Sequence, residues 1–311
     1  MGNNPDNRPL VAAFVGPTAS GKSDLAMKVA EELGGVIVCM DAMQVYRGMD
    51  IGTAKPSPAD QRRVPHRMLD VVSPEESYSV AAYAGDARKA LDESIGQGRL
   101  PLLCGGTGLY LRALRQPLSF GHTPGDEALR AGFQALAEKE GAAALHQRLA
   151  AVDPASAARL HPNDLRRVIR ALEVYELTGR AISAQEPPGE ADGPYRFVLF
   201  GLNWDREVLY RRIDGRVDRM MAAGLADEVK GLLDRGVSPA AQSMQGLGYK
   251  ELVPFLRGEA GYEDSLAVIK RRTRNYAKRQ MTWFKREPGI RWFPGGEDAA
   301  AQAVRIIKER L

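Results

Sequence analysis

The sequence predicts an α/β protein: a parallel β-sheet core with an inserted all-helical unit and a helical C-terminal part. Over the first third of the chain, short apolar runs alternate with amphipathic segments of helical spacing. Strands separated by helices imply βαβ units, whose ligand-binding loops lie at the carboxyl ends of the strands. From about residue 123 to 185 the chain is instead rich in Ala, Leu, Glu and Arg, with helical spacing and no strand pattern.

Three buried strands are expected in the first third, because each apolar run ends at Asp, Gly or a Gly-rich turn. They are Leu10–Val15, Val36–Met40 and Leu100–Cys104. Helices are expected between them over 22–33 and 79–95, the second with Ser79 as its N-cap.

A stretch of Pro, Gly and acidic residues, Glu186–Pro194, has the composition of a linker and closes the helical region. Strand character resumes at Arg196–Gly201, and the chain beyond it is mostly helical. At 311 residues the chain is long enough for two structural units. We therefore expect a sheet-bearing core of residues 1–120 and 195–311, and a helical insertion of residues 121–194.

The composition is that of a globular cytoplasmic protein. Hydrophobic residues make up 44% of the chain and charged residues 26%, which is ordinary for such proteins. No run approaches the ~18 apolar residues that span a bilayer, and the polar N-terminus lacks the apolar core of a signal peptide. The two cysteines, Cys39 and Cys104, have no Cys or His neighbours at metal spacing, which favours a reducing compartment. A cytoplasmic monomer without a membrane partner is expected.

The segment Gly16–Ser23, GPTASGKS, has P-loop spacing between the first strand and the first helix. Backbone N–H groups at such a helix start have no intrahelical partner and can hold an anion. Lys22 adds a positive charge, and Ser23 is placed to coordinate a phosphate-bound Mg²⁺. This context favours phosphate binding over a simple capping turn. Most chains with the motif bind a nucleoside triphosphate, but the motif alone does not identify the ligand.

The residues needed for triphosphate hydrolysis are sparse. Asp41 alone follows a strand cleanly as an acid, and there is no Asn-Lys-x-Asp motif for a nucleotide base. Asp41 has two interpretations. It caps a turn or binds the metal, or it acts as a general base, because an ionised carboxylate can accept a proton from an attacking amine.

A second strand–turn–helix entry is GGTGLYLRAL, residues Gly105–Leu114, with Thr107 at the helix start. A simple βα turn is one interpretation. Two Gly-rich turns at the same sheet edge favour a shared anion site, which the hydroxyl and N–H of Thr107 could face.

Two basic segments suggest contact with a nucleic acid. The helix predicted within His161–Gly179 starts at Asn163 or Asp164, carries Arg166, Arg167 and Arg170 on its surface, and turns Ile169, Leu172 and Leu177 toward a core. The second segment, Lys270–Arg286, contains eight Lys or Arg and no acid.

On a helix, that second segment places Arg271, Arg274, Lys278 and Lys285 on one side and Tyr276, Gln280 and Trp283 on another. Basic groups interleaved with aromatics suit a nucleic-acid backbone and its stacked bases. The alternative gives the aromatics to the core and the arginines to water. The lack of acidic i+4 partners within the segment speaks against a merely solvated face.

Seven stretches occur in the order seen in tRNA dimethylallyltransferases, and the chain resembles that family from about Leu10 to Arg286. The stretches are GPTASGKS, DAMQVYRGMDIGTAKP, PHRMLD, GGTGLYLRAL, HPNDLRRVIRALEVY, GLGYKE and AKRQMTWFKR. The resemblance implies a P-loop NTPase-like core whose loop holds the diphosphate of dimethylallyl diphosphate. It implies that N6 of adenosine 37 in a tRNA anticodon loop attacks C1 of the allylic chain, with Mg²⁺ as cofactor. The absence of a Cys/His zinc extension after residue 286 fits the bacterial type.

The resemblance also implies roles for individual residues. Asp41 would orient and deprotonate N6, Thr107 would lie near both substrates, and Arg216 would clamp the diphosphate. The diphosphate would lie on Gly16, Pro17, Thr18, Ala19, Ser20, Gly21, Lys22 and Ser23, with the metal on Ser23. The tRNA would contact Asp41, Ala42, Met43, Gln44, Thr107, Arg130, Arg166, Arg167, Val168, Ile169, Arg170, Lys278, Arg279, Gln280, Trp283 and Lys285.

One departure from the family lies beside the base: Ala42 stands where the family commonly has Ser, which puts a hydroxyl contact near the base in question. Three alternatives remain at this stage. An adenylate isopentenyltransferase would act on free AMP or ATP, and a small-molecule or nucleotide kinase would transfer phosphate from ATP. A non-catalytic RNA-binding module would tolerate Asp41→Ala.

Overall fold

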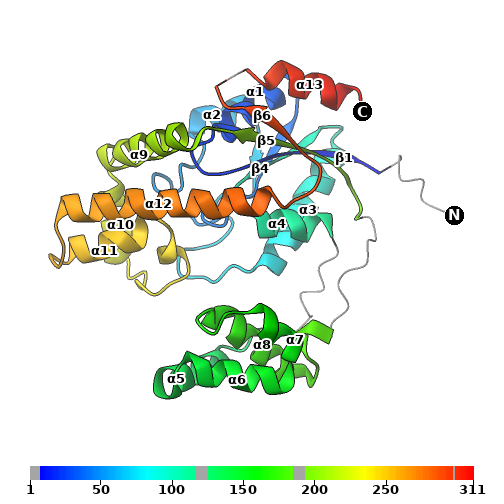
Figure 1. Ribbon diagram of the computed structural model, residues 1–311. Helices are drawn as coiled ribbons and strands as arrows, with labels where there is room; N and C mark the ends of the chain where they lie inside the picture. Colours follow the sequence, from blue (N-terminus) through cyan, green and yellow to red (C-terminus); the bar gives the residue numbers. More distant parts are fainter. Residues whose placement is uncertain (1–7, 117–124, 185–192, 297) are drawn as a thin grey trace. The chain divides into compact units, whose positions relative to one another are not determined.

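The computed structural model describes residues 8–116, 125–184, 193–296 and 298–311. The chain divides into two compact units, one of Met1–Arg115 and Asp192–Leu311 and the other of Gln116–Ala191 (Figure 1). Most of the linker predicted over Glu186–Pro194, and the frayed N-terminus predicted over the first residues, lie outside the described residues.

The first unit contains a six-stranded, all-parallel sheet in the order β3-β2-β4-β1-β5-β6. The strands are β1 (Leu10–Val15), β2 (Val36–Cys39), β3 (His66–Arg67), β4 (Pro101–Gly105), β5 (Arg196–Asn203) and β6 (Ile290–Pro294). The four predicted strands are confirmed within a residue or two at each end. The edge strands β3 and β6 were not predicted, because β3 has two residues and β6 is buried on one side only.

Helices cover both faces of the sheet (Figure 1). Those of the first unit are α1 (Lys22–Leu33), α2 (Pro58–Arg63), α3 (Val80–Gly96), α4 (Gly108–Arg115), α9 (Arg206–Ala222), α10 (Leu225–Asp234), α11 (Tyr249–Leu256), α12 (Tyr262–Phe284) and α13 (Ala300–Lys308). The crossover from β1 to β2 runs in the opposite direction along the sheet from the crossover between β2 and β4. Right-handed crossovers therefore place α1 and α3 on opposite faces. Helix α13 packs beside α1, and α4 packs beside α3 and α12. The predicted helices are confirmed, including Ser79, which accepts a hydrogen bond from the N–H of Ala82 as the N-cap of α3.

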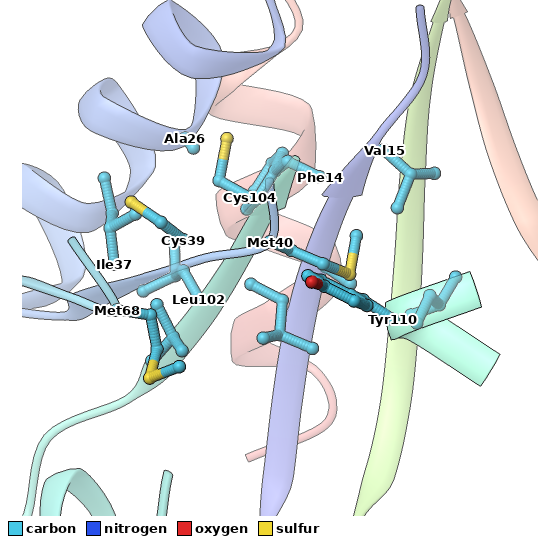
Figure 2. Packing of buried hydrophobic residues seen from close by; sticks show 14 of the residues in the cluster. Phe14, Val15, Ala26, Ile37, Cys39, Met40, Met68, Leu102, Cys104 and Tyr110 are labelled. Atoms are coloured by element: carbon cyan, nitrogen blue, oxygen red, sulfur yellow. The ribbon is translucent and has the colours of Figure 1, made fainter. Parts of the chain in front are cut away.

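The core of this unit is apolar on both faces of β1, where all six residues are buried (Figure 2). Phe14 of β1 stacks on Phe200 of β5 with ring centroids 5.3 Å apart, which ties the central strands together. Cys39 and Cys104 are buried, free thiols at paired positions of β2 and β4. Burial raises the pKa of both thiols, so they remain protonated, as expected for small buried side chains.

The second unit is helical and has its own apolar cluster. Its helices are α5 (Glu127–Glu140), α6 (Ala142–Val152), α7 (Pro154–Arg159) and α8 (Leu165–Thr178), followed by a short 3₁₀ turn, Ile182–Ala184. Leu145, Leu149 and Leu172 are buried among them. Helix α8 starts after Asp164 and ends at Gly179 in the left-handed conformation, as predicted. Leu177 was wrongly predicted to face the core, because its side chain lies on the outer side of α8 and is exposed.

No helix among the described residues is long and apolar enough to cross a membrane.

Candidate active site

Three loops meet at the carboxyl edge of the sheet, because β1, β2 and β4 are neighbours there. Gly16–Ser23 follows β1, Asp41–Gln44 follows β2, and Gly105–Thr107 ends β4 and leads into α4. The sheet order therefore brings together the P-loop, the candidate base and the second Gly-rich turn.

The P-loop has the backbone that an anion cradle requires. Gly16, Ala19 and Gly21 all have positive φ angles, 136°, 61° and 92°, which curl the loop around the start of α1. The hydroxyl of Ser20 is buried and has no hydrogen-bond partner among the described residues. The loop thus presents a buried polar group and the N-terminus of a twelve-residue helix at one place.

Lys22 lies at the first position of α1 and donates a hydrogen bond from Nζ to the carbonyl oxygen of Pro17 at 3.1 Å. Loss of solvent around the ammonium group lowers the pKa of Lys22, and Arg216 lowers it further, while Cys104 and Asp41 act in the opposite direction. No carboxylate of the described chain forms an ion pair with it. An incoming diphosphate would supply the missing negative charge.

Asp41 and Thr107 belong to loops that are hydrogen-bonded to each other. The Thr107 hydroxyl accepts a hydrogen bond from the N–H of Ala42 at 3.2 Å, and the Thr107 N–H donates to the carbonyl of Met40 at 3.3 Å. An Asp41 carboxylate oxygen accepts from the N–H of Met43 at 2.8 Å, which fixes its direction. A Cβ at Gly105 would overlap the Met40 carbonyl, so only glycine permits this approach.

Arg216, on α9, is the third predicted catalytic residue. Burial is the largest influence on its guanidinium and lowers the pKa of Arg216, whereas Asp41 raises it. Lys22, Arg216 and Asp41 are therefore close enough for their charges to act on one another. Two cations and one carboxylate at the mouth of a phosphate loop suit a reaction that releases an anion and a proton.

Gln280 of α12 joins two of these loops. Its side-chain oxygen accepts from the N–H of Thr18 at 2.9 Å, and its side-chain nitrogen donates to the carbonyl of Gly106 at 2.9 Å. The residue is buried, so the predicted contact of its side chain with tRNA is wrong. The amide is already engaged by backbone groups of the two turns.

Trp283, on the next turn of α12, is half-buried and packs against Gly108, where a Cβ would overlap its ring. The Arg112 guanidinium lies over the ring, 5.2 Å from its centroid. Part of this ring therefore belongs to the packing of α4 on α12.

The basic segment on α12 is partly neutralised by acids of other helices, which the sequence interpretation did not anticipate. Lys270 pairs with Asp218 and Arg274 with Asp214, both on α9, and Arg272 pairs with Glu251 on α11. Lys278, Arg279 and Lys285 are exposed and form no ion pair with any described residue. These three cations are the part of the segment free to meet phosphates.

The basic residues of the second unit also fall into two groups. Arg166 and Arg167 are exposed, with Arg167 3.4 Å from Asp164. Arg130 and Arg170 both bind the buried carboxylate of Glu173. Burial would raise the pKa of Glu173, but hydrogen bonds from these arginines and from a backbone N–H hold it below its ordinary value.

Two neighbours in that helix cannot act as predicted through their side chains. Val168 and Ile169 are buried in the apolar cluster of the second unit, so the prediction that they contact tRNA is corrected for both side chains. They lie on the inner face of α8, opposite Arg166 and Arg167.

Several residues that support the site carry no sequence motif. Trp204 donates from its indole nitrogen to the carbonyl of Ser20 at 2.8 Å, and Arg212 donates to the carbonyl of Ala19 at 2.9 Å while lying over the Trp204 ring. Together they hold the outer side of the P-loop. Side chains that bind backbone atoms leave no spacing pattern that a sequence could reveal.

No group of three or more His, Cys, Asp or Glu side chains in the described parts of the chain could hold a metal ion. Mg²⁺ bound to a diphosphate does not need one, since it keeps several waters and takes few protein ligands. The exposed hydroxyl of Ser23, in the first turn of α1, suits a metal held mainly by phosphate oxygens.

Comparison with known proteins points to one family. Residues 44–287 match the model of the family described as IPP transferase, and residues 9–71 match that of isopentenyl transferase. A tRNA dimethylallyltransferase of Pelotomaculum thermopropionicum is 50% identical over 304 residues, covering 98% of this chain and 96% of the relative.

Two solved structures share the whole architecture. The full-length tRNA isopentenylpyrophosphate transferase from Bacillus halodurans aligns with a TM-score of 0.72 at 41% identity, covering 98% of this chain and 97% of that one. A eukaryotic dimethylallyltransferase crystallised in the course of acting on tRNA aligns with a TM-score of 0.81 at 27% identity, covering 97% and 79%.

Proposed function

The chain belongs to the IPP transferase family, and from this premise we propose that it is a tRNA dimethylallyltransferase. The donor is dimethylallyl diphosphate, the acceptor is N6 of adenosine 37 in the anticodon loop, and diphosphate is released. The observation that carries this proposal is the meeting of Lys22, Arg216 and Asp41 at the mouth of the P-loop.

In the proposed reaction, the N6 lone pair attacks C1 of the allylic chain while the bond between C1 and the diphosphate oxygen breaks. The leaving diphosphate carries the electron pair away. Lys22, Arg216, the Ser20 hydroxyl and the free N–H groups of the loop stabilise its charge. A divalent metal fits beside Ser23, and Mg²⁺ there would neutralise part of the same charge.

Asp41 takes the second half of the chemistry. Once N6 has bonded to carbon, it carries an excess proton, which the Asp41 carboxylate accepts. Its fixed oxygen receives the N–H of Met43, so the other oxygen is the one available to N6. Thr107, which bonds the same loop, holds that carboxylate at the correct edge of the diphosphate cradle.

The acceptor is held by exposed cations. Lys278, Arg279 and Lys285 in the first unit, and Arg166 and Arg167 in the second, are suited to phosphate contacts. The adenine must leave its stack to reach Asp41, and a single-stranded loop permits this at low cost. We propose that the enzyme works as a monomer in the cytoplasm, where its tRNA substrates are found.

The deciding experiment incubates the purified protein and Mg²⁺ with labelled dimethylallyl diphosphate and either unmodified tRNA or AMP. Label in tRNA alone is the expected result. Label in AMP would keep the chemistry and replace the acceptor. No transfer to either, together with turnover of ATP, would overturn the proposal in favour of a kinase.

A further inference from the structure

The turn Asp50–Lys55, which lies in one of the motifs shared with the family, is held by a single carboxylate from far along the chain. Glu228 of α10 accepts hydrogen bonds from three successive backbone N–H groups: those of Asp50 and Ile51 at 2.8 Å each, and that of Gly52 at 3.1 Å. Three converging N–H groups form a small anion-binding nest, and here the anion belongs to the protein itself.

The same carboxylate is fixed from its other side. The Tyr249 hydroxyl, in the GLGYKE stretch, donates to Oε1 of Glu228 at 2.5 Å. A Cβ at Gly52 would lie 2.5 Å from the Tyr249 ring, so the turn is seated directly against this side chain. The shared stretches IGTAKP and GLGYKE thus meet at Glu228, which belongs to neither.

The turn in turn holds the loop that carries the candidate base. The side-chain nitrogen of Gln44 donates to the carbonyls of Thr53 at 3.1 Å and Ala54 at 3.2 Å. Gln44 is three residues beyond Asp41, and the residue between, Met43, donates its N–H to the Asp41 carboxylate. A continuous set of hydrogen bonds therefore runs from Glu228 through the turn to the Asp41–Gln44 loop.

The diphosphate cradle is held by different contacts. Gln280, Trp204 and Arg212 bind the P-loop backbone, and none of them bonds to the Asp50–Lys55 turn. A change at Glu228 should therefore reach the acceptor side of the site and spare the donor side.

We propose that Glu228 is a positioning residue for the acceptor, one that sets the Asp41–Gln44 loop through the Asp50–Lys55 turn and leaves diphosphate binding unaffected. The inference rests on the proposed transfer to tRNA. A carboxylate is needed because it offers about four acceptor positions on two oxygens to three N–H groups and one hydroxyl. An amide at this place would offer one oxygen and turn two further donors toward donors.

The test compares Glu228→Gln and Tyr249→Phe with the wild-type protein. Asp92→Asn is the matched control, because Asp92 accepts a hydrogen bond from Tyr195 at 2.7 Å and has no part in the site. Three quantities are measured: kcat/KM for unmodified tRNA, the Kd for dimethylallyl diphosphate, and hydrogen exchange at the amides of residues 50–52.

For Glu228→Gln we expect kcat/KM for tRNA to fall about tenfold or more, faster exchange at residues 50–52, and a Kd for the diphosphate within about twofold of wild type. Tyr249→Phe keeps all three N–H bonds and should show a smaller loss of the same kind. Asp92→Asn should change none of the three quantities. If Glu228→Gln does not fold, the pattern in Tyr249→Phe decides.

Equal losses in tRNA turnover and diphosphate affinity would reduce Glu228 to a general structural role and overturn the inference. Unchanged tRNA kinetics despite faster exchange would overturn it as well, because the turn would then not be coupled to Asp41. A wild-type protein that transfers nothing to tRNA would instead defeat the proposed function, and this result is visible before any variant is made.

Discussion

The side-chain oxygen of Gln280 accepts the backbone N–H of Thr18 at 2.9 Å, although 262 positions separate the two residues. This bond turns one N–H of the P-loop toward α12 and away from the anion cradle. The exposed cations Lys278 and Arg279 lie on the same turns of α12, on its outer face. One helix thus carries a bond to the donor loop on one face and charges suited to the acceptor on the other.

Replacing Gln280 by Leu should weaken binding of dimethylallyl diphosphate by about tenfold, because the Thr18 N–H and the Gly106 carbonyl lose their partners and the loops shift. The Kd can be measured by calorimetry. Thr282→Ala is the control: its hydroxyl is exposed and bonds only to the Lys278 carbonyl of its own helix. A wild-type Kd in Gln280→Leu would show that the bridge does not shape the cradle.

Asp41→Asn should reduce single-turnover transfer to tRNA by about two orders of magnitude or more, as expected for loss of a general base. The Kd for dimethylallyl diphosphate should stay near the wild-type value, since Asn can still accept the Met43 N–H. Affinity for the diphosphate or for Mg²⁺ that collapses together with turnover would identify Asp41 as a metal ligand instead.

Lys278→Ala with Arg279→Ala should weaken tRNA binding and make the slope of log K against log salt shallower by about one unit. Both cations are exposed, and no ion pair with a described residue neutralises either. A double variant of Arg305 and Lys308 on α13 removes the same charge elsewhere. The assignment fails if both double variants change the slope equally.

Donor binding should be linked to proton uptake at alkaline pH. Burial lowers the pKa of Lys22 from its ordinary 10.5, and a bound diphosphate would raise it again. Between the lowered value and 10.5 the ligand-free protein has lost this proton, so binding takes one up. Over the same window the unfolded chain holds more protons than the folded one, and the free protein gains stability as the pH rises.

Calorimetry in two buffers of different ionisation enthalpy measures this uptake. Lys22→Arg is the control, because arginine stays protonated throughout this range. Identical proton uptake in the wild type and in Lys22→Arg would assign the proton to another group.

Ser23→Ala should raise the Mg²⁺ concentration needed for half-maximal transfer, while saturating metal restores most of the rate, because the diphosphate supplies the other ligands. A metal titration at fixed substrate concentrations measures this. Ser20→Ala gives the comparison: its buried hydroxyl is expected to affect diphosphate affinity rather than the metal requirement. An unchanged metal requirement in Ser23→Ala would remove Ser23 from the metal site.

The central strands could be predicted because they are buried on both faces and therefore appear as continuous apolar runs. Leu10–Val15 matches its predicted bounds at both ends. The edge strand Ile290–Pro294 could not be predicted in this way, since Arg291 and Pro294 interrupt its apolar pattern where the sheet meets solvent.

The loops of the site were predictable because glycine spacing and strand ends mark them, whereas the groups that hold those loops were not. Gln280 lies in a basic segment and suggested an RNA contact until the structure showed its amide bound to two backbone groups. Glu228 gives no signal at all, because its partners are N–H groups more than 170 positions away.

The last residue of α4, Arg115, lies against Gly193, where the described chain returns from the helical unit. A Cβ on Gly193 would be 2.8 Å from the Arg115 carbonyl oxygen. The inserted segment therefore leaves and rejoins the sheet-bearing unit at one point, and the entropy of closing such a loop grows only slowly with its length. Evolution can add or remove helices here without changing the register of β1 with β5. The size of the part that meets a macromolecule can thus vary between lineages while the pocket for the small donor stays the same.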